Sequence, residues 1–68
     1  DILTWYQTAQ AYSTLKNEPM ADLATAEAWY NAGDMKKALI FATRARGKLP
    51  QGGADWQRAS DIVGAARP

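Results

Sequence analysis

The middle of the chain reads Gly33-Asp34-Met35-x2-Ala38-x6-Ala45-x4-Pro50. Glycine is the residue that most readily ends a helix in the left-handed conformation, and aspartate is a good N-terminal cap for the helix that follows. Ala38 and Ala45 are small residues at helical spacing, where a second helix can approach closely. Pro50 cannot continue a helix and marks its end. The stretch predicts two helices joined by a tight turn, with alanine where they cross.

Four helices account for the apolar spacing, over residues 2–15, 19–32, 35–49 and 55–66. The second is apolar around most of its circumference, so we expect it to be the central helix, with neighbours on more than one side. The apolar stripes of the other three are formed by Trp5, Ala9, Tyr12 and Leu15; by Met35, Ala38, Leu39, Ala42, Ala45 and Leu49; and by Trp56, Ala59, Ile62, Val63 and Ala66.

The links between these helices are short, which favours antiparallel neighbours. The predicted fold is therefore all-α, with antiparallel helix hairpins stacked in series as a right-handed array of about four helices. Residues 1–68 form a single helical domain in this interpretation. A compact four-helix bundle is the alternative.

The size and composition of the chain limit its function. One hydrophobic core is marginal for 68 residues, and alanine supplies much of the 47% hydrophobic content. The net charge of +1 lacks the basic excess of nucleic-acid-binding domains, so no nucleic-acid partner is expected. No apolar run reaches the ~20 residues of a membrane span. The chain starts at Asp1 without an initiator methionine, and we expect it to be a fragment of a longer protein.

The side chains needed for catalysis are missing from this sequence. It contains no His and no Cys, and a zinc site made of Asp and Glu alone would match zinc poorly. It has no HExxH motif, no Ser–His or Cys–His couple and no phosphate-binding glycine loop. We therefore expect no catalytic, cofactor-binding or metal-binding residue among these 68 residues.

The second and third predicted helices resemble one tetratricopeptide repeat. Gly33, Ala38, Ala45 and Pro50 fall on its turn, crossing-alanine and terminal-proline positions. The first helix carries Trp5-x2-Thr8-Ala9-x2-Tyr12, which is similar to the opening of such a repeat, Trp-x2-Leu-Gly-x2-Tyr. The first and second helices can therefore be read as a repeat as well, and the phase of the repeat stays open.

A narrower resemblance covers residues 23–62. It is carried by Leu23-Ala24-x-Ala26-Glu27-x-Trp29-Tyr30-x-Ala32-Gly33-Asp34, by Lys37-Ala38-x3-Ala42-x-Arg44-Ala45, and by Leu49-Pro50-x-Gly52-x2-Asp55-Trp56-Gln57-Arg58-Ala59-x-Asp61-Ile62. These residues resemble the C-terminal tail of bacterial exported HExxH zinc metallopeptidases of the prenyl-protease-like family, which end in tetratricopeptide repeats. The resemblance implies a periplasmic parent with zinc in its catalytic domain, and a tail that binds substrate or partner proteins.

In a repeat stack, the first helix of each pair lines the concave face. The two phases give two candidate peptide grooves, formed by Tyr6, Gln10 and Ser13 or by Glu27, Tyr30 and Asn31. Glu27 lies among apolar neighbours in the sequence, and we expect it to pair with Arg58 or Lys16. A basic group on a bound peptide is the alternative partner of this carboxylate.

Charged and aromatic residues each have a structural and a functional interpretation. The positive charges on or near the third helix are Lys36, Lys37, Arg44, Arg46 and Lys48. They form a solvated face in the structural interpretation, and a docking patch for an acidic partner or an anionic membrane in the other. Glu18 and Asp22 are expected to complement a helix dipole. The tryptophans are expected in the core, with a peptide groove as the alternative.

The resulting hypothesis is a noncatalytic protein–protein interaction module, the substrate- or partner-binding tail of a zinc metallopeptidase. A stand-alone tetratricopeptide-type scaffold domain, linked to no enzyme, is the alternative. Its partner would be a protein or peptide ligand or an upstream domain of the same chain. Trp5 and Tyr12 make the first helix too apolar for a terminal repeat, so self-association through that helix is compatible with both.

Overall fold

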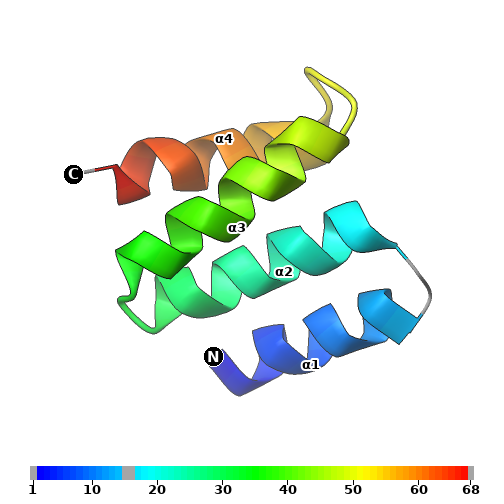
Figure 1. Cartoon of the computed structure of the whole chain (residues 1–68), viewed down its shortest axis with the longest axis vertical. Coiled ribbons are helices and arrows are strands. Elements are labelled where there is room, and N and C mark those ends of the chain that lie inside the picture. The colour runs from blue at the N-terminus through cyan, green and yellow to red at the C-terminus, as the bar shows by residue number, and fades with distance from the viewer. Residues whose placement is uncertain (1, 15–16, 68) are drawn as a thin grey trace.

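The computed structural model describes residues 2–14 and 17–67, with the backbone alone for residues 12–14. This part of the chain folds into four α-helices, α1 (Ile2–Thr14), α2 (Glu18–Asn31), α3 (Met35–Lys48) and α4 (Ala54–Ala66), and contains no strand. Consecutive helices run in opposite directions, from α1 at one edge of the molecule to α4 at the other (Figure 1). The predicted all-α fold of four helices is confirmed.

Polar side chains cap the starts of α2 and α3, and the sequence predicts the second of these caps, at Asp34. The Asn17 side chain accepts a hydrogen bond from the Met20 N–H at 3.4 Å, and Pro19 lies in the first turn, where its missing N–H does no harm. The Asp34 side chain accepts from the Lys37 N–H at 3.1 Å at the start of α3. Each cap satisfies an N–H group that has no partner inside its helix.

The turn between α2 and α3 depends on Gly33, whose φ of 83° lies in the left-handed region. The Gly33 N–H donates to the Tyr30 carbonyl at 3.1 Å, and the Asp34 N–H donates to the Trp29 carbonyl at 2.9 Å. This pair of bonds is a Schellman motif, which satisfies carbonyls at the end of α2. The predicted left-handed cap at Gly33 is confirmed.

The predicted helix bounds lie within one residue of the observed ones wherever the structure describes them. Ala32 and Leu49, expected as the last residues of their helices, are the C-caps of α2 and α3. Helices α2 and α4 begin one residue earlier than predicted. Leu15, Lys16 and the side chain of Tyr12 lie outside the described residues, so these parts of the predictions stay open.

The helices form an open row with α2 inside it. Helix α2 packs against α1, α3 and α4, whereas α1 packs against α2 alone in the described part of the chain. In a closed four-helix bundle the first and last helices would also be neighbours, and here they are not. The molecule is accordingly flat, with extents of 32 × 27 × 16 Å. The expected central position of α2 is confirmed.

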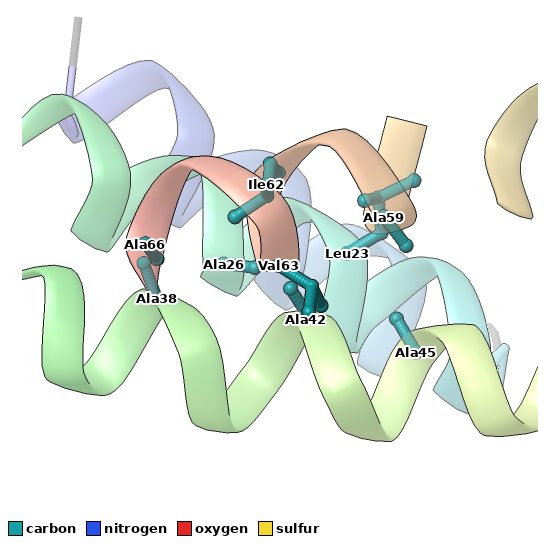
Figure 2. Packing of buried hydrophobic residues seen from close by; sticks show 9 residues of the cluster. All are labelled: Leu23, Ala26, Ala38, Ala42, Ala45, Ala59, Ile62, Val63 and Ala66. Atoms are coloured by element: carbon teal, nitrogen blue, oxygen red, sulfur yellow. The ribbon is translucent and has the colours of Figure 1, made fainter. Parts of the chain in front are cut away.

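Alanine dominates the core between α2, α3 and α4. Ala38, Ala42 and Ala45 are fully buried on one side of α3. Figure 2 shows them with the other members of the buried cluster, Leu23, Ala26, Ala59, Ile62, Val63 and Ala66. Ile62 and Val63 are the largest fully buried side chains, and burying each contributes about 1.5–3 kcal/mol. The apolar stripes predicted for the third and fourth helices therefore form most of the core.

The three tryptophans lie at the margin of this core. Trp29 packs against the buried cluster and is half-buried, and Trp5 and Trp56 are half-buried outside the cluster. An indole is too large to be fully enclosed in so thin a row of helices. The expectation that the tryptophans belong to the core is thus met in part.

Lys48 joins the end of α3 to the beginning of α2. Its Nζ lies 2.9 Å from Asp22 Oδ2 and 3.4 Å from Glu18 Oε2. The hydrogen bond with Asp22 raises the pKa of Lys48 above its ordinary value. Glu18 and Asp22, for which a role in complementing the helix dipole is expected, therefore hold this cation.

We expect Ala38→Leu and Ala45→Leu each to lower the free energy of unfolding by about 1–3 kcal/mol, because both alanines are fully enclosed and a larger side chain would overpack the helix contact. Urea unfolding followed by circular dichroism measures this change. Thr43→Leu, at an exposed position of the same helix, is the matched control. A loss no greater than that of the control would contradict the close packing of α3.

Candidate functional site

Three large apolar side chains are exposed on α1, beside exposed polar residues of the same helix. Ile2, Leu3 and Tyr6 are 44%, 61% and 56% exposed, and no residue of α1 carries a charge. Helices on a protein surface normally turn charged or polar residues toward water. These three side chains are therefore a candidate contact surface. We call Ile2, Leu3 and Tyr6 the α1 patch.

The first predicted groove, Tyr6, Gln10 and Ser13, lies along α1. Tyr6 and Gln10 are both exposed, and the Ser13 side chain is outside the described residues. Tyr6 thus belongs to the α1 patch, and Gln10 lies one turn further along the same helix. The structure places Tyr6 and Gln10 on an open surface.

The second predicted groove is partly closed by an ion pair. The Glu27 side chain is only 4% exposed, and both of its oxygens accept hydrogen bonds from the guanidinium of Arg58. The bond from Arg58 Nη2 to Glu27 Oε2 measures 2.7 Å, and the hydrogen bond to Glu27 raises the pKa of Arg58 above its ordinary value. The predicted pairing with Arg58 is confirmed, and this carboxylate fastens α2 to α4.

The neighbours of Glu27 also serve the fold. Tyr30 is half-buried and packs against the core cluster. The Asn31 side-chain amide donates to the Glu27 carbonyl at 2.9 Å, although the residue itself is exposed. The residues of this predicted groove therefore lie close together, but Glu27 and Tyr30 are held by contacts within the domain.

The exposed basic side chains of α3 differ in what they contact. Lys37 Nζ lies 4.3 Å from the centre of the Trp29 ring, and the Arg44 guanidinium lies 5.3 Å from that of Phe41. Both are cation–π contacts, which favour the ordered side chain. Lys36, in contrast, is exposed and forms no ion pair with any described residue. Lys37 and Arg44 therefore fit the structural interpretation, in which the basic residues form a solvated face, better than the interpretation as a docking patch.

A groove of about 500 Å³ opens between the beginning of α3 and the end of α4. We call it the α3/α4 groove. Its lining residues are Met35, Lys36, Leu39, Ala65, Ala66 and Arg67. The volume falls within the range of about 300–1,000 Å³ that is typical of ligand-binding clefts. Four of the six residues are apolar, and the two charged ones are both cations.

Sequence reasoning missed the α3/α4 groove. Met35, Leu39 and Ala66 were assigned to core stripes, and Ala65 and Arg67 were not singled out. One signal was present in the sequence, because Lys36 falls in the first turn of a helix, where a cation opposes the helix dipole. The groove itself joins residues about thirty positions apart, and no local pattern indicates such a meeting.

Within residues 2–14 and 17–67, no group of three or more His, Cys, Asp or Glu side chains could hold a metal ion. None of the four helices is both long and apolar enough to cross a membrane. The α1 patch and the α3/α4 groove are candidate binding surfaces of the described residues.

Arg58→Met should lower the free energy of unfolding by about 1–3 kcal/mol, because the buried Glu27 carboxylate would lose both of its hydrogen-bond donors. The double variant Arg58→Met/Glu27→Gln should recover part of the loss, because a neutral amide is less costly to bury. Arg44→Met is the matched control, since Arg44 is exposed and forms no ion pair with a described residue. Equal losses for Arg58→Met and Arg44→Met would contradict the fastening role of the pair.

In the isolated 68-residue chain, we expect α1 to be either covered by a second copy of the chain or more mobile than α3. We expect concentration-dependent self-association in sedimentation equilibrium, or a monomer whose α1 amides exchange faster than those of α3, because α1 packs on one helix only. Tyr6→Lys should suppress self-association, and Thr43→Lys, with the same charge on α3, should not. A monodisperse monomer with α1 as protected as α3 would contradict this prediction.

The chain was compared with protein-family models, curated proteins and solved structures. None of the three comparisons found a match. The resemblances to tetratricopeptide repeats and to the metallopeptidase tail therefore stay predictions from the residues quoted for them.

Proposed function

We propose that this chain is a noncatalytic protein–protein interaction module. The observation that carries the proposal is the α1 patch, three exposed apolar side chains on an uncharged helix that contacts only α2 within the described part of the chain. Exposed apolar surface of this kind typically marks a site of contact with another protein. The partner is a protein or peptide ligand, an upstream domain of the same chain, or a second copy that uses α1.

We further propose that the module is a tetratricopeptide-like array of helix pairs. The open row of antiparallel helices supports this, since each repeat in such an array contacts mainly its sequence neighbours. Helices α2 and α4 pack against each other, whereas α1 and α3 do not. This favours the phase in which α2 and α3 form one pair and α4 begins the next, with α2 and α4 on the binding face.

The parent protein proposed for this module is an exported bacterial zinc metallopeptidase. Support comes from the resemblance over residues 23–62, to which the structure adds a physical role for one residue. Arg58, in the block of that resemblance that covers residues 49–62, pairs with Glu27, which belongs to the resemblance too. Zinc and catalysis would belong to another domain of the parent, in the periplasm, and the module would bind substrate or partner proteins for it.

The coding sequence upstream of Asp1 tests this parentage. We expect a secretion signal, followed by an HExxH motif and a downstream glutamate ligand, because a zinc peptidase needs two histidines, a general base and a third ligand. Sequencing a few hundred codons upstream is sufficient. A start codon directly before Asp1, or further repeats without a metal motif, would contradict the parentage and leave a stand-alone scaffold domain.

A further inference from the structure

We propose that the α3/α4 groove binds an acidic peptide segment in which an aliphatic side chain lies next to a carboxylate. The inference rests on the proposed function of the chain as an interaction module. It adds a second binding site, separate from the α1 patch and at the opposite edge of the row of helices (Figure 1). It also gives that site a partner of defined chemistry.

The floor of the groove is suited to an aliphatic side chain. Met35 and Leu39 lie one turn apart on α3 and are half-buried, and Ala65 and Ala66 close the groove from α4. The two alanines leave room that a larger residue would fill, and Met35 has a flexible side chain that can adapt to different shapes. An apolar side chain placed there would remove apolar surface from water on both sides.

The charges at the groove are both positive. Lys36 and Arg67 line it, each is exposed, and neither forms an ion pair with a described residue. The acidic residues that form ion pairs in the described part of the chain do so with Lys48 and Arg58, not with the two cations of the groove. A carboxylate beside the bound aliphatic side chain would therefore meet two cations and no lining acid, which favours acidic partners over basic ones.

The position of Lys36 is not explained by the stability of its own helix. A cation in the first turn opposes the helix dipole, and α3 has no acidic residue in that turn. Lys37, its neighbour, is accounted for by the contact with Trp29. Lys36 has no comparable contact within the described residues. Its charge is therefore available to a ligand at the groove.

A peptide fits this site better than an anionic membrane does. Membrane surfaces are bound by apolar side chains that project from a helix into the lipid. Here the apolar residues line a hollow, so that the partner has to supply the projecting side chain. This is the geometry of peptide recognition by a groove.

The probe is a fluorescein-labelled peptide, Ser-Leu-Glu-Leu-Glu-Ser with both ends blocked, titrated with the 68-residue chain in a fluorescence anisotropy experiment. We expect saturable binding that weakens as salt is added. A peptide with Lys in place of Glu and one with Ser in place of Leu should both bind at least about threefold more weakly, because each removes one of the two matching features.

Two pairs of variants locate the site. Ala65→Phe should abolish binding by filling the groove, and Ala54→Phe, at an exposed position at the other end of α4, should leave it unchanged. Lys36→Gln/Arg67→Gln should weaken binding about three- to tenfold, as expected for two partly exposed ion pairs. Arg44→Gln, which removes a cation away from the groove, should have little effect. Circular dichroism checks that every variant is folded.

Saturable binding that Ala65→Phe abolishes and Ala54→Phe does not would establish the site. Equal binding of the lysine peptide, binding that Ala65→Phe leaves unchanged, or no binding at millimolar peptide would overturn it. Binding to anionic phospholipid vesicles without peptide binding would also overturn it, in favour of a membrane surface. The other proposals fail independently of this one. A start codon directly before Asp1 would overturn only the peptidase parentage. A monodisperse monomer whose α1 amides are as protected as those of α3 would overturn only the role of the α1 patch.

Discussion

The close contact of α3 with α2 and α4 is the constraint on which the rest of this domain depends. The chain is too short for a large core, and its buried cluster consists mainly of alanine, with Leu23, Ile62 and Val63 as its larger members. Alanine contributes little apolar area for each residue buried, so the helices gain stability only if their backbones approach closely. The small residues of α3 therefore set both the spacing of the helices and the thinness of the molecule.

A second interaction fixes how α4 lies on this layer. Alanine methyl groups allow two packed helices to adopt many relative orientations. The two hydrogen bonds between Arg58 and Glu27, in contrast, require one relative position of α2 and α4. The buried carboxylate also makes other arrangements costly, because it would then lose its donors. Apolar packing thus supplies the stability, and a single charged pair adds orientation across thirty-one positions of sequence.

The open row has consequences for binding. A closed bundle hides the apolar side of every helix, but a row has two edges, and here the edges differ. The α1 patch is apolar and uncharged and has exposed polar residues such as Gln10 beside it on the same helix, as expected of a surface that another protein covers. The α3/α4 groove combines an apolar floor with two cations, as expected of a surface that selects its partner by charge. The two edges are therefore suited to different kinds of contact.

The residues alone indicate the helices, the caps at Gly33 and Asp34, the alanine stripe of α3, and Arg58 as one of the partners considered for Glu27, which the structure confirms. These features depend on neighbouring residues, because capping and helical periodicity are local properties of the chain. Tertiary packing sets the other features: within the described residues α1 contacts a single helix, the tryptophans are half-buried, and residues 35–39 meet residues 65–67 in a groove. Such meetings depend on how whole helices pack, and side-chain volumes and one ion pair between distant residues set that packing.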